Sequence, residues 1–359
     1  MTDRPPVRLA LFLILFAVAP LCFAQQPTAR DEQETVKVYT EEVRLPVVAY
    51  NDRERFDPTL AADDVLVLED GVPQRVRSVR RVPANILLVF DMGGQVTSTG
   101  AANATANAAL RLFGGLRAGD SVAFIHNGRR VELVQDWTED LTAARHLLTT
   151  KLLCANCASL SVFSANRSRL SECVALAGTK LKERPVGNTH VVLFTDGLEA
   201  QSREEIRADE IARDAVRGLL ASQASVHVFG FSSLVGEVVK RKKSMFSGGI
   251  NFDFQMRRWF KNYEQATKKR EGQLLALARE AGGRLLLPGS AEEVPALAEK
   301  VARDIGAQYV VTYRPLRPFA EGGVGERRRA EVSARRMGLQ LFTLRSVVTA
   351  PQRATQDEQ

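Results

Sequence analysis

Residues 85–98, NILLVFDMGGQVTS, give the clearest indication of the fold. Its apolar run, ILLVF, continues without a polar interruption from Ile86 to Phe90 and ends at Asp91. A short run of this kind is typical of a strand that is buried on both faces of a parallel sheet. The aspartate that follows indicates one of three features: a metal site, a phosphate-binding loop or a turn.

Further apolar runs alternate with helical patterns through the middle of the chain. The apolar runs are SVAFI (121–125), HVVLFTD (190–196) and SVHVFGF (225–231). Between and after them, helical patterns are expected at about 101–114, 141–153, 170–182, 203–222 and 291–305. Strands that alternate with helices pair in a mostly parallel sheet covered on both faces. We therefore predict an α/β fold with a doubly wound, Rossmann-like sheet.

Both ends of the chain show an extended, alternating pattern instead. Residues 35–50, 64–82, 308–316 and 327–348 fit strands, and Glu69-Asp70-Gly71 fits a hairpin turn. This pattern predicts a β-sandwich-like unit with strands from both ends. The predicted organisation is a signal peptide (1–24), an N-terminal β unit (34–82), an α/β domain (83–306) with a basic insert (238–272), C-terminal strands that join the N-terminal unit (307–349), and a disordered tail (350–359).

The N-terminus has the pattern of a secretory signal. Two arginines precede the apolar run LALFLILFAVAPLCFA, which ends in small residues, so we expect cleavage after Ala24. An uncleaved membrane anchor is the alternative. The mature chain is therefore expected in the periplasm or outside the cell, tethered to the membrane if the signal is retained.

Three cysteines remain after such a cleavage. Cys154 and Cys157 form a CxxC in a polar stretch, which favours a small structural disulfide over a redox catalyst. Cys173 lies at a core position of a helical pattern, where a buried thiol is the commoner state. A bridge from Cys157 to Cys173 stays open as an alternative.

Positive charge is concentrated in one segment. The chain of 359 residues has a formal net charge of +7, and residues 240–270 hold ten Lys or Arg against two acidic residues, interleaved with aromatic side chains. Such a segment fits an anionic membrane surface, an envelope polymer or an acidic protein face. A solvated loop and helix is the plain alternative, and nucleic acid is not expected for an exported chain. The residues proposed for a ligand surface are Lys240, Arg241, Lys242, Lys243, Arg257, Arg258 and Trp259.

The strand ends resemble a known family. One strand ends in Asp91, a hydroxyl residue opens a later helix, and another strand ends in Thr195-Asp196-Gly197. This arrangement resembles the von Willebrand factor type A domain, whose metal-ion-dependent adhesion site consists of Asp-x-Ser-x-Ser, a threonine and an aspartate. The flanking segments LVLEDGVPQRVRSV and LLALAREAGGRLLL with IGAQYVVTYRPL resemble bacterial exported proteins of the "VWFA-related" type.

The resemblance implies a cation site, here a degenerate one. Asp91 matches the first aspartate, Asp196 the last, and Ser168 the threonine. Gly93 and Gln95 stand where the family has two serines, so Gln95 is the remaining oxygen donor. Hard cations prefer such oxygen ligands, and the implied cofactor is Mg²⁺ or Mn²⁺. A metal-independent rim, with the same residues as polar contacts or helix caps, is the alternative.

The resemblance implies a non-enzymatic, adhesion-type module that binds a protein partner. Two alternatives remain: a structural or assembly protein with an inert rim, and an ATP-binding enzyme that uses DMGG as a phosphate loop. Export, Gln95 in place of a hydroxyl and the absence of a following hairpin pattern weigh against the enzyme. The scattered histidines and the lack of a nucleophile elbow give no support to a hydrolase.

Overall fold

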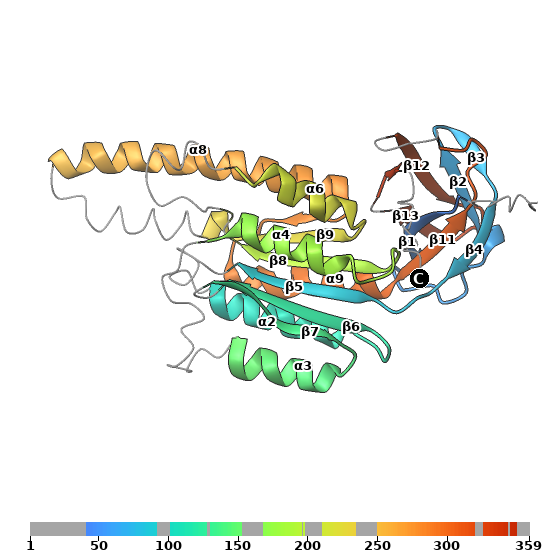
Figure 1. The fold of residues 1–359 in the computed structure, drawn as a ribbon, viewed down its shortest axis with the longest axis horizontal. Coiled ribbons are helices and arrows are strands. Elements are labelled where there is room, and N and C mark those ends of the chain that lie inside the picture. Colours follow the sequence, from blue (N-terminus) through green and yellow to red (C-terminus); the bar gives the residue numbers. More distant parts are fainter. Residues whose placement is uncertain are drawn as a thin grey trace, which may run out of the picture. The chain divides into compact units, whose positions relative to one another are not determined.

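The computed structural model describes residues 41–91, 101–127, 130–152, 168–195, 197, 210–234, 250–319, 326–343 and 345–349. These residues all belong to one compact unit, Glu41–Gln359. Their strands form one six-stranded sheet and two four-stranded sheets (Figure 1). The predicted signal peptide, Cys154, Cys157 and the C-terminal tail lie outside the described residues. No described helix is long and apolar enough to cross a membrane.

The six-stranded sheet is parallel apart from one edge strand. Its strands are β5 (Asn85–Asp91), β6 (Ser121–Asn127), β7 (Val131–Thr138), β8 (Thr189–Thr195), β9 (Ser225–Gly230) and β10 (Leu285–Leu286). The order across the sheet is β10-β9-β8-β5-β6-β7, and only β7 runs antiparallel to its neighbour. Because β5 lies in the middle, the chain winds first to one side of it and then to the other, as in doubly wound folds.

Helices cover both faces of this sheet. They are α2 (Ala101–Gly114), α3 (Leu141–Leu147), α4 (Leu170–Leu181), α6 (Arg213–Ala221), α8 (Ile250–Ala281) and α9 (Val294–Gly306). Alternate side chains of β5 face opposite ways: Leu88 and Phe90 pack with α2 and α9, whereas Leu87 and Val89 pack with α4, α6 and α8 (Figure 1). This double burial explains the unbroken apolar runs, and the predicted fold class is confirmed.

The remaining strands form a β-sandwich-like unit. One sheet has the order β13-β1-β11-β4 and the other β14-β12-β2-β3. The strands are β1 (Val43–Asn51), β2 (Val65–Glu69), β3 (Val72–Gln74), β4 (Val76–Arg80), β11 (Gln308–Tyr313), β12 (Arg327–Ala334), β13 (Leu339–Thr343) and β14 (Val347–Thr349). Leu45, Val67, Val311 and Ala330 share its core, so strands from both ends of the chain bury one another.

The predicted hairpin turn joins β2 to β3. Asp70 and Gly71 have φ of 49° and 80°. Both values lie in the left-handed region, which the type I′ turn requires and which glycine and aspartate tolerate better than most residues. The Asp-Gly pair was therefore a reliable local signal.

Three elements differ from the sequence expectation. The helix expected over 141–153 is α-helical only to Leu147 and continues as a five-residue π-helical turn, Leu148–Leu152. Strand β7 was not predicted, because its half-buried residues alternate with polar ones and form no apolar run. Helix α6 begins at Arg213, because Ala212 is not helical and donates its amide to Ser171 Oγ. Residues 203–209 of the expected helix lie outside the described residues.

The described part of the predicted basic insert is helical. From Ile250 onward it is part of α8, a single helix of 32 residues that continues to Ala281. Cys173 is buried on α4, as expected.

Two buried histidines, His190 in β8 and His227 in β9, lie towards the ends of the strands opposite Asp91. Their rings stack with centroids 5.6 Å apart, and within the described residues neither ring nitrogen of His227 has a hydrogen-bond partner. Burial, together with the charge of Arg284, lowers the pKa of His227 to about 3. Burial and then the charge of His227 lower the pKa of His190 well below its usual value. Both rings are therefore neutral in the folded protein at neutral pH.

This pair predicts a loss of stability in mild acid. Below about pH 6.5 the unfolded chain binds protons at both histidines while the folded chain does not, so the free energy of unfolding falls as the pH falls from 6.5 towards 4. Each histidine contributes a slope approaching about 1.4 kcal/mol per pH unit. Urea titrations should show a shallower slope for His227→Leu. The variant His146→Gln, altered at an exposed position on α3, is the control, and an unchanged slope in His227→Leu would contradict the assignment.

Candidate functional site

The candidate site lies at the carboxyl ends of the central strands. Strand β5 ends at Asp91, β6 at Asn127 and β8 at Thr195, and Asp91 is in register with Thr195. Ser168 lies just before α4, whose first residue is Leu170. Parallel strands bring their carboxyl ends to one edge of the sheet, where α/β proteins bind ligands. We call Asp91, Asn127, Ser168 and Thr195 the carboxyl rim.

Asp91 is the centre of the carboxyl rim. Its Oδ2 accepts hydrogen bonds from Ser168 Oγ at 2.6 Å and Thr195 Oγ1 at 2.7 Å. Its Oδ1 accepts from Asn127 Nδ2 at 2.8 Å and from the backbone amide of Arg169 at 3.1 Å. Two strands and the start of one helix are thereby tied to the end of β5.

The burial of this carboxylate makes its hydrogen bonds necessary. Asp91 and Thr195 are 0% exposed, and Ser168 is 2% exposed. An ionised carboxylate that loses its water without replacement donors costs several kcal/mol, and a carboxylate accepts about four hydrogen bonds. The four protein donors replace the lost water. The same bonds leave no acceptor position on Asp91 unused.

The chain after β8 is packed tightly against α8. Gly197 has φ of +79°, and a Cβ placed there would lie 2.6 Å from Cγ of Arg270. Its amide donates to Thr195 Oγ1 at 2.8 Å. Arg270 belongs to the basic segment of residues 240–270, yet it is 2% exposed. Glycine is required at 197 for its backbone conformation and for this close approach.

The structure brings together two of the predicted ligands and adds two residues that were missed. Asp91 and Ser168 are in direct contact although 77 positions separate them. Gln95, Asp196 and Lys240 to Lys243 lie outside the described residues, as do the side chains of Arg257, Arg258 and Trp259 on α8. Thr195 and Asn127 were missed as partners of Asp91. Each is the last residue of a strand and follows an apolar run, and this position could have indicated that both lie at the same edge of the sheet as Asp91.

The described acidic, histidine and cysteine side chains do not form a metal centre by themselves. Within the described part of the chain, no group of three or more of them lies close enough to hold an ion. Among the described residues, the side-chain groups bonded to Asp91 are instead the hydroxyls of Ser168 and Thr195 and the amide of Asn127. Ser168 donates its hydroxyl hydrogen to Asp91 and keeps its own oxygen lone pairs for another contact.

The strand order decides the type of fold. Counted along the chain, the six strands lie in the order 3-2-1-4-5-6, with the aspartate at the end of strand 1 and an antiparallel strand 3 at the edge. The fold is von Willebrand A-like. The likeness that the sequence indicated is thereby confirmed for the fold.

The chain was compared with known proteins by sequence and by structure. Protein-family models and curated proteins gave no sequence match. Among solved structures, the chain is similar to a von Willebrand factor type A protein from Catenulispora acidiphila, with 10% identity and a TM-score of 0.42 over 87% of this chain and 73% of that one. An aerotolerance-related membrane protein from Bacteroides fragilis is similar over 62% of this chain and 98% of that one, with 13% identity and a TM-score of 0.40.

A third solved structure carries a metal. Proximal thread matrix protein 1 from the mussel byssus, solved with a zinc-occupied MIDAS motif, has 11% identity and a TM-score of 0.42 over 63% of this chain. The match covers 48% of the mussel protein, about half of its length.

Replacing Asp91 with asparagine should destabilise the fold. In Asp91→Asn an NH₂ group replaces one oxygen and faces two donors, so we expect the free energy of unfolding to fall by about 2–4 kcal/mol. Urea unfolding measures the change. Asp214→Asn, at a side chain that is 90% exposed, is the matched control and should stay within about 0.5 kcal/mol of the wild type. Equal stability of the two variants would show that Asp91 does not organise the rim.

Proposed function

We propose that this chain is an exported, non-enzymatic module that binds a protein partner at the carboxyl rim. The contact of 2.6 Å between Asp91 and Ser168 carries the proposal, because it unites two predicted site residues at the sheet edge where ligands bind. The segments that follow β5, β8 and β9 leave the sheet at this same edge. Surface segments held by a rigid sheet are the usual carriers of recognition.

The hydrogen bonds of Asp91 favour a rim that works without a cation on that residue. A metal bound directly to Asp91 would displace donors that already occupy both oxygens. Asp91 therefore fits poorly as a direct ligand. In the proposed arrangement it positions Ser168 and Thr195, and the partner contacts the segments that surround them.

The basic residues after β9 are a second part of the proposed surface. Lys240 to Lys243 follow the end of β9 at Gly230 by about ten positions and carry four positive charges. Such charges speed the encounter with an acidic partner or an anionic envelope surface. We propose that they steer the partner towards the carboxyl rim.

Site-specific photo-crosslinking tests the proposal in the cells that make the protein. A photoreactive residue at Arg169, beside the carboxyl rim, should give a discrete protein adduct. The control is position 183, where Glu183 follows the other end of the same helix, α4, and should give none. Adducts from 183 alone, or equal adducts from both positions, would contradict a partner at the rim.

Calorimetric titration of residues 25–359 with MgCl₂ and MnCl₂ tests the proposal that the carboxyl rim works without a bound cation. We expect no saturable heat up to millimolar concentrations, because Asp91 has no oxygen position left to offer. Saturable binding that disappears in Ser168→Ala would establish a working adhesion site and overturn this form of the proposal. Thr59→Ala, an exposed hydroxyl of the β unit, serves as the control variant.

A further inference from the structure

A second candidate surface lies in the β-sandwich-like unit, away from the carboxyl rim residues in sequence and sheet. A pocket of about 610 Å³ opens between β4 and the segment that follows β11. Three arginines line it, Arg75, Arg77 and Arg314. The remaining lining is apolar and comes from Val76, Pro315, Leu316 and Pro318. We call this the arginine pocket.

The three arginines carry charge that the described residues leave uncompensated. Each is exposed, and no carboxylate of the described residues forms an ion pair with any of them. Nearby Arg317 differs, because it pairs with Asp70 and Glu326. Three like charges around one pocket repel one another, so an anion placed among them gains from all three.

The backbone of β4 is available for pairing beside this charge. Strand β4 is the last in its sheet and pairs only with β11 among the described strands. A register shift against β11 lets Val76 and Val79 both pack on the core although they are three positions apart. Arg75 and Arg77, on either side of Val76, are consequently exposed. An extended peptide can add to such an edge through main-chain hydrogen bonds.

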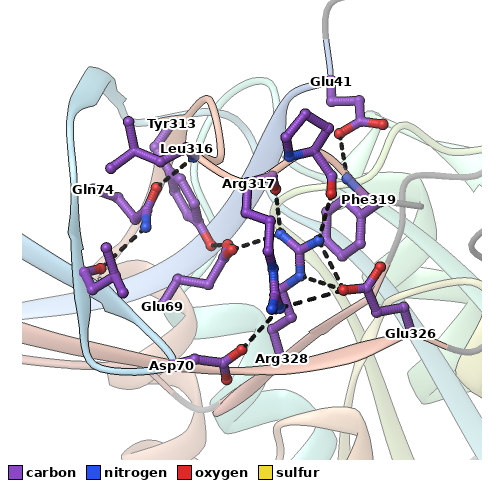
Figure 2. Close-up of polar contacts among 12 residues, drawn as sticks. Glu41, Glu69, Asp70, Gln74, Tyr313, Leu316, Arg317, Phe319, Glu326 and Arg328 are labelled. Atoms are coloured by element: carbon purple, nitrogen blue, oxygen red, sulfur yellow. Dashed lines mark hydrogen bonds and ion pairs between the residues drawn. The ribbon is translucent and has the colours of Figure 1, made fainter.

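The arginine pocket also presents an exposed apolar side chain, Leu316. Leu316 is 68% exposed and Val72 is 48% exposed, two of the four large hydrophobic side chains that are exposed in the described residues. Buried Gln74 ties their backbones together: its Oε1 accepts from the amide of Leu316 at 3.0 Å, and its Nε2 donates to the carbonyl of Val72 at 3.1 Å (Figure 2). The buried side chain of Gln74 thereby fixes the backbone of Leu316, whose side chain remains exposed.

Arg328 holds the wall of the arginine pocket in place. This side chain is 1% exposed and pairs with Glu69 at 2.8 Å and with Glu326 at 2.8 Å. It also donates to the carbonyls of Arg317 at 2.6 Å and Pro318 at 2.9 Å, and Figure 2 shows these bonds converging on one guanidinium group. The segment between Arg314 and Phe319 is therefore ordered before any ligand arrives, which lowers the entropy cost of binding.

We propose that the arginine pocket binds an extended acidic peptide segment of a partner protein. The peptide adds to the free edge of β4, its carboxylates pair with Arg75, Arg77 and Arg314, and an apolar side chain packs on Leu316. Side chains on one face of a strand repeat every second residue, about 7 Å apart, so carboxylates that alternate with apolar residues match this surface. The site is independent of the carboxyl rim.

Fluorescence anisotropy tests the proposal with a labelled ten-residue peptide of alternating Glu and Val. The full mature chain should bind it at low salt and more weakly at 300 mM NaCl. Arg77→Glu and Arg314→Glu should each raise the dissociation constant at least tenfold, and Leu316→Ala severalfold. The matched control is Arg53→Glu, at another exposed arginine of the same unit, which should change it less than twofold.

Further probes separate this site from general charge attraction. A peptide with Ser in place of Glu, and one N-methylated at alternate residues, should both bind at least tenfold more weakly. Equal loss in Arg53→Glu, undiminished binding of the N-methylated peptide, or no binding to the wild type at millimolar peptide would overturn the proposal. So would equal or tighter Arg77-dependent binding of a ten-residue oligothymidylate or of phosphatidylglycerol vesicles. Photo-crosslinking from Arg169 should be unchanged in Arg77→Glu, which keeps the two sites distinguishable.

Discussion

The buried carboxylate of Asp91 is the constraint on which the α/β part of the molecule depends. It stands at the end of the central strand with no exposed surface, so its charge is stabilised only by donors that the fold brings to it. Those donors come from Asn127, Ser168, Thr195 and the amide of Arg169. The ends of β6 and β8 and the start of α4 therefore have to meet at one point.

Arg328 has the corresponding role in the β-sandwich-like unit. It too is a buried charge, and acidic side chains and carbonyls from several segments surround it. Burial, followed by the hydrogen bond and the charge of Glu69, raises the pKa of Tyr313, so that its hydroxyl remains a donor to Glu69. The two charges order different surfaces. Asp91 organises the carboxyl rim, and Arg328 supports the wall of the arginine pocket.

Much of the fold was predictable because its signals are local. The unbroken run before Asp91 required burial on both faces, and Asp70-Gly71 required a tight turn. Strand β7 gave no such signal, since an edge strand that is half buried keeps many polar residues. The burial of Arg270 could not be read either, because its neighbours in the chain are basic and its packing partner is Gly197. A charge run in the sequence does not say which of its members faces inward.

Sequence patterns alone were enough to predict the doubly wound sheet, the contribution of both chain ends to the β unit, and Asp91 as the residue at the end of the central strand. These follow from hydrophobic periodicity and turn chemistry, which act over a few neighbouring residues. The folded arrangement was needed to see that Ser168, Asn127 and Thr195 saturate Asp91, and that Arg328 fixes the segment around Leu316. Such contacts join residues far apart in the chain, and their geometry exists only once the packed core has set the distances between strands.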